Sequence, residues 1–264
     1  MKTYYTLITG ASQGYGKSMA LEFAKRGMNL ILVALPDSGL KKLSKFIELH
    51  FNVKVCYLEL DLSLSVSCYD ILRYIEVNGL QVKYLVNNAG VLSRGEFSGL
   101  SEKYILKQID VNVMTPTLLI RLLLSNLKSN GPAGILNISS MASFFALPTK
   151  QVYGGTKAYL TSFSRSLRKE LKHDNISVTT ICPGGLNTTT RLCYQNRLMG
   201  WISRKSILNP EEAAIIAIEA MLKAKKVVIP GFINKCLMFL DKLLPEFIKD
   251  KLAEREIKKI PQVT

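Results

Sequence analysis

The sequence predicts an α/β fold in which a parallel sheet of about seven strands is covered by helices on both faces. Short, nearly continuous apolar runs alternate with amphipathic helical patterns along residues 4–229. Strands without a polar face are typical of a parallel sheet that is buried on both sides. Glycine and polar clusters follow four of the strands, at the edge where doubly wound sheets bind their ligands. We therefore expect one doubly wound domain over residues 1–230, with its ligand site at that edge.

The individual elements follow from the periodicity of the apolar residues. Strands are expected at residues 4–9, 29–34, 53–60, 82–87, 133–139, 176–182 and 226–229. Helices are expected at residues 17–26, 38–50, 65–77, 101–128, 150–172 and 210–223, with an interruption near Pro116. Pro210 is a good helix start, because proline suits the first turn and two glutamates follow it. Residues 189–209 are expected to form a lid-like connection.

The C-terminal segment predicts an amphipathic helical extension over residues 231–264. From Phe232 onward, FINKCLMFLDKLLPEFIKDKL carries apolar residues at helical spacing with lysines between them. Pro245 is expected to begin a second helix. Two interpretations stay open. The extension either packs on its own domain or a partner subunit, or its helices wall an elongated pocket or lie on an anionic membrane surface.

Composition narrows the classes of function. The 264 residues are 48% hydrophobic and 21% charged, which suits one well-buried α/β domain. The formal charge of +15 suggests anionic partners, but no zinc-finger, basic-zipper or RNA-binding motif accompanies it, so nucleic acid is not expected. Five scattered cysteines and two histidines show no metal-ligand spacing, and no metal is expected. The chain enters a strand pattern at once and has no long apolar run, which predicts a cytoplasmic protein.

One short stretch carries the residues best suited to catalysis. Tyr153 and Lys157 lie four apart in a predicted helix and so share a face, and Ser140 lies at the end of the preceding strand. Lowering the pKa of a phenol by roughly 3 units takes about 4 kcal/mol of preferential stabilisation of the phenolate. A neighbouring cation in a partly desolvated cleft can supply that stabilisation. A tyrosine and a lysine four apart are also common in surface packing, so this pair needs support from other motifs.

A glycine-containing loop joins the first strand to the first helix. Its sequence, TGASQGYG at residues 9–16, holds Gly10, Gly14 and Gly16. Glycine lets the backbone turn tightly, approach a pyrophosphate and open a helix whose first amides attract anions. The spacing differs from G-x-G-x-x-G, and strand-to-helix turns use glycine routinely, so the loop alone is weak evidence.

Taken together and in order, the motifs resemble the short-chain dehydrogenase/reductase family, in the branch that uses a Tyr-x-x-x-Lys pair. The resemblance covers residues 1–230 and rests on TGASQGYG, Asp61, NNAG at residues 87–90, Asn112, Ser140, the Tyr153–Lys157 pair and PGGLNT at residues 183–188. It implies a single Rossmann domain that interconverts a ketone and a secondary alcohol by hydride transfer from or to a nicotinamide. The likeness extends to ketoacyl reductases and hydroxysteroid dehydrogenases.

The resemblance implies a role for each matching residue. Tyr153 is the acid/base group, and Ser140 holds the substrate oxygen. Lys157 lowers the pKa of Tyr153 and binds the nicotinamide ribose, Asn112 anchors a proton-relaying water, and Asn87 lies beside the adenosine ribose. The implied cofactor-binding residues are Gly10, Ser12, Gln13, Gly14, Tyr15, Gly16, Leu35, Asp61, Leu62, Asn88, Ala89, Gly90, Tyr153, Lys157, Pro183, Gly184 and Thr188.

Three departures from the family pattern are visible. Tyr15 replaces an aliphatic residue, which is expected to reshape the floor of the nicotinamide pocket. YGGTK is more flexible than the usual Tyr-Ser-Ala-Ser-Lys, since glycine in a helix costs ~1 kcal/mol against alanine. The second strand ends without an acid, and Asp37 either binds the adenosine ribose or, as is commoner before a helix, caps it. Lys41 and Lys42 follow within one turn and could reach a 2′-phosphate, so we expect NADP(H) rather than NAD(H).

The predicted lid favours a particular substrate chemistry. No acidic residue occurs between Asp174 and Glu211. The basic residues there, Arg191, Arg197, Arg204 and Lys205, are interspersed with Leu192, Leu198, Met199, Trp201 and Ile202. A cationic and apolar mouth suits an amphiphilic anion such as an acyl thioester or a conjugated steroid.

Two further expectations concern activity and assembly. A nucleotide-sensing or scaffold protein that lost the chemistry is the alternative function, but such proteins typically lose a member of the Ser-Tyr-Lys set, and all three are present here. The resemblance also implies a homodimer or homotetramer, in which the helices at residues 101–128 and 150–172 pair between subunits.

Overall fold

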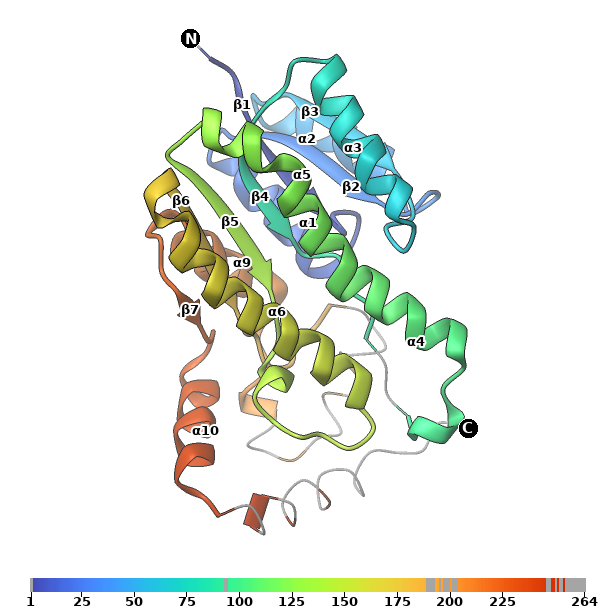
Figure 1. Cartoon of the computed structure of the whole chain (residues 1–264), viewed down its shortest axis with the longest axis vertical. Helices are drawn as coiled ribbons and strands as arrows, with labels where there is room; N and C mark the ends of the chain where they lie inside the picture. Colours follow the sequence, from blue (N-terminus) through green and yellow to red (C-terminus); the bar gives the residue numbers. More distant parts are fainter. Residues whose placement is uncertain are drawn as a thin grey trace.

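The fold is built on one parallel, doubly wound sheet, as the sequence predicts (Figure 1). The computed structural model describes residues 2–92, 95–188, 193–194, 196, 200, 204–245, 248–249, 251 and 254. Within these parts the sheet has seven strands in the order β3-β2-β1-β4-β5-β6-β7. Strand order reverses between β1 and β4, which makes the carboxyl ends of these two strands the switch point where such sheets bind ligands.

The elements match the predicted ones closely. The strands are β1 (Tyr4–Thr9), β2 (Asn29–Ala34), β3 (Val55–Glu59), β4 (Gln81–Asn87), β5 (Ala133–Ile138), β6 (Ile176–Ile181) and β7 (Val227–Val228). The α-helices are α1 (Gly14–Lys25), α2 (Leu40–His50), α3 (Ser65–Val77), α4 (Glu102–Ile109), α5 (Thr115–Ser129), α6 (Gln151–Glu170), α9 (Pro210–Leu222) and α10 (Phe232–Leu243). Short helical turns are η1 (Phe97–Gly99), η2 (Asp110–Met114), η3 (Met141–Ser143) and η4 (Leu171–Asp174).

Two apolar layers hold the helices to the sheet. On one face α1, α2 and α9 pack around fully buried Phe23, Ile47 and Ile218. On the other face α3, α5 and α6 lie across the sheet, with Ile71 and Leu123 at the centre of that layer. Because the strands are buried from both sides, their sequences show no polar face.

The long helix is interrupted just before Pro116, near the predicted place. Residues Asp110–Met114 form a π-helical turn that joins α4 to α5. In a regular α-helix, the carbonyl of Asn112 would accept a hydrogen bond from residue 116, and proline has no N–H to donate. The irregular turn therefore has a local cause that can be read from the sequence.

The expected N-cap at Asp37 is wrong. Helix α2 begins at Leu40 and its N-cap is Gly39, with φ of +78°. Asp37 also has a positive φ of +56°, so it lies in the turn between β2 and the helix. Asp37 and Gly39 both have left-handed backbone conformations, which are not helical, so the helix begins only after Gly39.

The C-terminal extension begins as predicted with α10, which ends before Pro245. The amides of Ile248 and Lys249 donate to the Pro245 carbonyl at 3.1 and 3.3 Å, and the remainder of the predicted second helix lies outside the described residues. In the part of the chain that the structure describes, no helix is both long and apolar enough to span a membrane. The domain boundary at residue 230 stays a prediction.

Candidate active site

Two adjoining cavities lie at the carboxyl edge of the sheet. We call the first the glycine-loop cavity; it has a volume of about 340 Å³ and is bordered by the segments that follow β1, β2, β3 and β4. We call the second the Tyr153 cavity; it has about 350 Å³ and is bordered by η3, α6 and residues 183–188. Four residues line both cavities, namely Tyr15, Asn88, Gly90 and Thr188. The two cavities therefore form one elongated site across the switch point.

The glycine loop is shaped by close backbone approach. Gly10 has φ of +65°, and a side chain there would press on the backbone of Ala89. A Cβ at Gly16 would overlap the carbonyl oxygen of Gly10. Glycine is thus required at both positions, one for its backbone conformation and one for the space between the loop and the helix start.

The NNAG segment fastens this loop to β4. The Asn88 side-chain amide donates to the carbonyls of Thr9 and Gly10 at 2.9 and 3.1 Å. The Thr9 hydroxyl accepts from the backbone amides of Asn88 and Ala89, both at 3.0 Å. Asn87 lies elsewhere than the resemblance implied: its side chain is buried, donates to Asn137 at 2.8 Å and lines neither cavity.

The start of α1 can accept an anion. Gln13 is the N-cap and makes no capping bond with its side chain, and the first turn of this helix carries no acidic residue. The first amides of a helix have no intrahelical partner and carry the positive end of the helix dipole. With glycine in the loop, these amides open toward the cavity, so the residues present fit the pyrophosphate of a dinucleotide.

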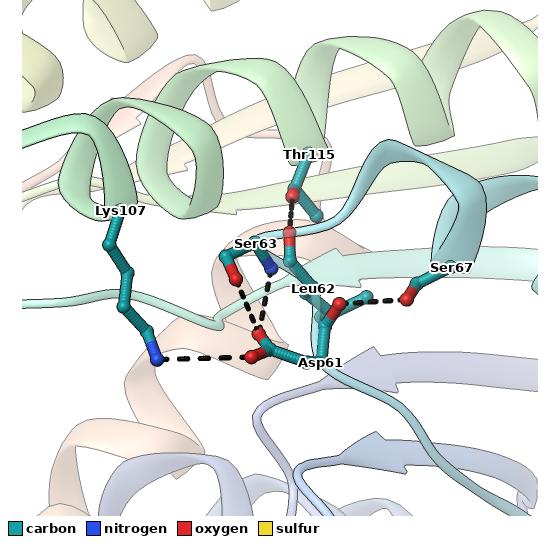
Figure 2. Close-up of polar contacts among 6 residues, drawn as sticks. All are labelled: Asp61, Leu62, Ser63, Ser67, Lys107 and Thr115. Carbon is teal, nitrogen blue, oxygen red and sulfur yellow. Dashed lines mark hydrogen bonds and ion pairs between the residues drawn. The ribbon is translucent and has the colours of Figure 1, made fainter. Parts of the chain in front are cut away.

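Asp61 forms one wall of the glycine-loop cavity, and its contacts with Ser63 and Lys107 are shown in Figure 2. One carboxylate oxygen accepts from the backbone amide and the hydroxyl of Ser63, at 2.9 and 2.8 Å, and the other lies 3.9 Å from Lys107. The backbone and hydroxyl bonds of Ser63, with a smaller contribution from Lys107, hold the pKa of Asp61 below its usual value against an opposing effect of burial. The carboxylate therefore stays charged and oriented at neutral pH.

The end of β2 provides no acid to this cavity. Leu35 and Ser38 line it, whereas Asp37, Lys41 and Lys42 are not part of its wall. The Ser38 hydroxyl donates to the Leu35 carbonyl at 2.6 Å, which fixes the turn. Lys107, which reaches the cavity from α4, is a lining cation that the sequence motifs did not indicate.

Ser140, Tyr153 and Lys157 all line the Tyr153 cavity. Ser140 follows β5 and is the N-cap of η3, where its hydroxyl accepts from the amide of Ala142 at 3.1 Å. Tyr153 and Lys157 lie one turn apart on α6, and the Lys157 ammonium is 5.8 Å from the centre of the Tyr153 ring. The structure thus brings three of the four predicted catalytic residues into one space from two elements, and the fourth, Asn112, does not line this cavity.

Lys157 is almost fully buried, with 4% of its surface exposed. Its ammonium donates to the Ile138 carbonyl at 2.8 Å. Burial lowers the pKa of Lys157 to about 8, and the nearby Cys182 opposes this by raising it. At pH 7 the side chain is therefore still mostly a cation beside the tyrosine, and its charge is solvated by protein rather than by water.

Asn112 supports the site from behind and lines neither cavity. Its side-chain oxygen accepts from the Val91 amide at 2.8 Å, and its side-chain nitrogen donates to the Val91 carbonyl and the Thr156 hydroxyl at 3.0 and 3.1 Å. Thr156 in turn donates to the carbonyl of Tyr153 at 2.7 Å. Asn112 thereby connects the irregular helical turn with the segment after β4 and with α6.

Tyr15 lies between the two cavities, as expected for a residue that shapes the pocket floor. Its ring is 7% exposed, and its hydroxyl donates to the Ala213 carbonyl of α9 at 3.0 Å. Burial raises the pKa of the Tyr15 phenol. Tyr15 therefore stays a neutral donor that joins the start of α1 to α9.

The segment after β6 closes the site and depends on α10. Pro183 and Gly184 line the Tyr153 cavity, and Thr188 lines both cavities. A side chain at Gly184 would lie 2.7 Å from the side-chain oxygen of Asn234. Asn234 itself is 2% exposed, and its amide donates to the carbonyls of Ser206 and Pro230 at 2.9 and 2.8 Å.

Asn234 is a residue that the sequence analysis missed. The only signal was one amide within the apolar stripe of the extension, and the pattern alone did not say which element it would face. Most of the predicted lid, including Arg191, Arg197 and the apolar residues Leu192, Leu198, Met199, Trp201 and Ile202, lies outside the described residues. Arg204 and Lys205 are described and exposed.

All predicted cofactor-binding residues line one of the two cavities. Gly10, Ser12, Gln13, Gly14, Tyr15, Gly16, Leu35, Asp61, Leu62, Asn88, Ala89, Gly90 and Thr188 line the glycine-loop cavity. Tyr153, Lys157, Pro183 and Gly184 line the Tyr153 cavity. Among the described residues, no group of three or more histidine, cysteine, aspartate or glutamate side chains is placed to hold a metal ion.

Comparison with known proteins identifies the family. The sequence model of the family described as short chain dehydrogenase matches residues 5–196. The very-long-chain 3-oxoacyl-CoA reductase of Rattus norvegicus is 34% identical over 183 residues, which are 68% of this chain and 58% of that protein. Hydroxysteroid dehydrogenase-like protein 1 of Gallus gallus is 29% identical over 249 residues, 92% of this chain and 73% of that protein. The chain belongs to the short-chain dehydrogenase/reductase family of enzymes.

Solved structures agree with this assignment. The short-chain dehydrogenase from Sphingobium yanoikuyae in complex with NADPH is 26% identical, with a TM-score of 0.79 over 98% of this chain and 97% of that one. The NADPH in that complex supports a nicotinamide cofactor for the family fold. This chain spans less than two thirds of the length of the rat reductase.

Proposed function

We propose that this protein reduces a ketone to a secondary alcohol with NADPH. The observation that carries the proposal is the cavity shared by Ser140, Tyr153 and Lys157, which opens into the glycine-loop cavity through common lining residues. A nicotinamide dinucleotide would supply the hydride. The polypeptide would bind it, orient the ketone and deliver the proton.

The proposed roles follow from the contacts. Ser140 donates a hydrogen bond to the carbonyl oxygen of the ketone, and Tyr153 transfers its phenolic proton to that oxygen as negative charge develops there. Lys157 stabilises the phenolate that remains, because its buried ammonium lies beside the ring. These donors are fixed before the reaction, so little reorganisation accompanies proton transfer.

The proton must then return to Tyr153. Asn112 and Thr156 are bonded to each other and to the backbone of Tyr153, which places a polar path behind the catalytic helix. We infer that a water bound near Asn112 would relay protons toward Lys157. This relay supports turnover rather than the hydride step.

Replacing Tyr153 with phenylalanine tests the mechanism. We expect kcat/KM for a reducible ketone to fall about 10³-fold, because the proton donor is removed, with NADPH affinity nearly unchanged. Tyr159→Phe is the matched control, since Tyr159 lies on the same helix and its hydroxyl contacts Thr117 at 3.1 Å, away from both cavities. Activity of Tyr153→Phe within a few-fold of the parent would contradict the mechanism.

The preference for NADPH rests on the wall of the glycine-loop cavity. The end of β2 contributes Ala34, Leu35 and Ser38 and no carboxylate that would repel a 2′-phosphate. Lys41 and Lys42 are exposed on the first turn of α2, next to this wall. We expect NADPH to bind about tenfold more tightly than NADH, and Lys41→Ala/Lys42→Ala to lose most of that ratio. Equal Kd values by calorimetry would contradict the preference.

The substrate is proposed to be an amphiphilic anion, such as an acyl thioester. The Tyr153 cavity combines apolar side chains, including Phe145 and Leu147, with the cation Lys150. Arg204 and Lys205 are exposed where the lid meets α9. We expect a 3-oxoacyl thioester of coenzyme A to have a higher kcat/KM than the same acyl group on uncharged N-acetylcysteamine. Equal kcat/KM values for the two thioesters would contradict a contribution of the anionic group to substrate recognition, and only the apolar acyl group would then be recognised.

A catalytically inactive scaffold remains the second candidate, from a different class of function. It would bind NADPH and show no turnover with a broad panel of ketones. The presence of Ser140, Tyr153 and Lys157 in one cavity favours the enzyme.

We also propose a homodimer or homotetramer through α4, α5 and α6. Leu106, Ile109 and Tyr159 are large side chains that are 59%, 40% and 39% exposed on these helices, and burial between subunits would remove that apolar surface from water. Light scattering at micromolar concentration should give at least twice the mass of 29.5 kDa. A monomer mass would contradict the assembly.

The outer side of α10 is proposed to lie on an anionic membrane surface. Phe232, Phe239, Leu240 and Leu243 are 80%, 64%, 50% and 65% exposed there, while Asn234 fixes the inner side. Apolar side chains flanked by lysines suit the interface of anionic lipids. Binding to phosphatidylserine vesicles at low salt should weaken in Phe239→Ser/Leu243→Ser; vesicle binding that is absent or insensitive to this change would contradict the proposal.

A further inference from the structure

A third cavity lies at the opposite edge of the sheet from the active site. It has a volume of about 950 Å³ and is formed where β4, β5, β6 and β7 begin, between the end of α6 and the end of α9. In Figure 1 this edge is at the end of the sheet away from α10. The volume is within the range of small-molecule sites. We call it the amino-edge cavity.

The charge of the amino-edge cavity is entirely positive. Six cationic side chains line it and no aspartate or glutamate does: the cations are Lys83, Arg165, Arg168, Lys169, Lys172 and Lys226. In the described part of the chain, no carboxylate lies within 4 Å of any of the six, whereas nearby Lys128 and Lys223 are paired with Asp174 and Glu219. The cavity therefore concentrates uncompensated positive charge.

Four of these cations form one stripe on α6 and its continuation. Arg165, Arg168, Lys169 and Lys172 are spaced by three, four and seven residues, so they project from one face. Like charges at this spacing destabilise a helix. The helix dipole favours cations in the last turn, but it does not account for Lys83 and Lys226, which come from β4 and from the residue before β7. Three separate segments thus bring positive charge to the same cavity.

Arg168 carries a positive charge that no carboxylate of the described structure pairs with. Strand β7 pairs with β6 only at Thr180 and Ile181, so the first half of β6 has no outer strand in the described structure. The Arg168 guanidinium fills this gap and donates to the carbonyls of Val178 and Ala224 at 2.7 and 2.6 Å. The carbonyls satisfy hydrogen bonds of the guanidinium but do not neutralise its charge. A phosphate would accept hydrogen bonds from it and also neutralise the charge.

The cavity also has apolar walls. Tyr84, Ile176, Met221, Leu222 and Val227 line it beside the cations. We propose that the amino-edge cavity binds a multiply charged organic phosphate, whose phosphates contact the α6 cations while its apolar part packs on these walls. The source of the phosphate can be a soluble metabolite or the headgroup of a phosphorylated lipid, since both present the same chemistry.

The first test uses two probes of different apolar content, inorganic tripolyphosphate and ATP, titrated by calorimetry in EDTA. The protein is saturated with NADP⁺ beforehand, so that the glycine-loop cavity is occupied. We expect both probes to bind, and ATP to bind at least threefold more tightly because of its base. No binding of ATP up to millimolar concentration would overturn the proposal, and equal affinities of the two probes would overturn the role of the apolar walls.

The second test uses charge-matched variants. Arg165→Gln/Lys169→Gln/Lys172→Gln should weaken ATP binding at least tenfold, and Lys25→Gln/Lys54→Gln/Lys103→Gln, which removes the same charge from exposed positions elsewhere, should weaken it less than twofold. Both variants should keep the NADPH affinity of the parent, which shows that they are folded. An equal loss in the two variants would overturn the proposal, since binding would then follow net charge alone.

Vesicles separate the two sources of phosphate. If vesicles containing phosphatidylinositol 4,5-bisphosphate displace ATP from the parent protein, the ligand is a lipid headgroup; if they do not, it is soluble. Either result supports the cavity as the site, provided that the α6 variant loses the binding. Retention of vesicle or ATP binding by the α6 variant contradicts it. Because no turnover is measured, failure here leaves the proposed reductase activity untouched.

Discussion

The two cavities of the candidate active site are built in different ways. The glycine-loop cavity is made of segments that directly follow four strands, held together by backbone contacts such as those of Asn88 with Gly10. The Tyr153 cavity gathers side chains from η3, α6 and residues 183–188, and its outer wall depends on Asn234 of α10. The glycine-loop cavity should therefore lose its affinity for the cofactor when an added side chain fills the space between two backbone segments. The Tyr153 cavity should lose its affinity for the substrate gradually, as supporting contacts are removed.

The largest expected effect comes from filling the glycine loop. In Gly16→Ala the new methyl group would overlap the Gly10 carbonyl and the Asn88 amide, so the loop must shift from the position that binds pyrophosphate. We expect NADPH to bind about 100-fold more weakly, equivalent to about 3 kcal/mol. Fluorescence titration of NADPH measures the change.

Gly155→Ala is the control for this variant. Gly155 is exposed on α6, and an added Cβ would meet no atom within 4 Å. Alanine should raise the free energy of unfolding by about 0.5–1 kcal/mol without changing cofactor affinity. If the two alanine variants bound NADPH equally well, close approach in the glycine loop would not be what holds the cofactor.

The next effect concerns Lys157, where the two cavities meet. Its pKa is about 8 in the folded protein against 10.5 for an ordinary lysine. Between pH 8 and 10.5 this lysine binds more protons in the unfolded chain than in the folded protein, so the free energy of unfolding rises with pH. Below pH 8 the lysine is protonated in both states, and its contribution to the free energy of unfolding does not change with pH. Burying the charge thus costs about 3 kcal/mol at neutral pH.

Lys157→Met should remove that dependence. We expect the variant to lose reductase activity and to gain stability relative to the parent at pH 7.5, with the gain shrinking by about 2 kcal/mol at pH 9.5. Urea unfolding of both proteins at the two pH values isolates the lysine, because all other titrating groups are shared. A difference that stays constant with pH would mean that Lys157 titrates normally in the fold.

The smallest effect is expected at Asn234. Asn234→Ala leaves the carbonyls of Ser206 and Pro230 without their donor, which costs about 1–3 kcal/mol locally. We expect KM for the ketone to rise about tenfold with kcat within about twofold, because the wall of the Tyr153 cavity loosens while its catalytic groups remain.

The same variant should leave the glycine-loop cavity intact. Binding of ADP-ribose, which lacks the nicotinamide, should be unchanged, and Asn78→Ala on α3, whose amide bonds only within its own helix end, should change neither constant. A loss of ADP-ribose affinity equal to the rise in KM would mean that the two cavities are not built independently.

The features that can be predicted from the sequence follow the same division. The strands and most helices were predicted correctly, because apolar periodicity acts over a few neighbouring residues. The predicted cofactor-binding residues line the two cavities, and their contact with a cofactor stays a prediction. Asp37 was misassigned as a cap because two left-handed residues together moved the helix start to Gly39. Asn87 was expected at the ribose, but its side chain bonds to Asn137 on the next strand, a partner fifty residues away.

The order of the elements and the candidates for the catalytic groups can be read from the sequence. Tyr153 and Lys157 share a helix face because of their spacing, and Pro116 disturbs the long helix because proline has no N–H. The distant side chains that support them become apparent only in the folded molecule. Asn234 reaches residues 184 and 206, Lys107 reaches Asp61, and six cations from three segments meet at the amino edge. Such contacts depend on how helices are laid across the sheet, and no local pattern encodes a distance between segments that the chain brings together only on folding.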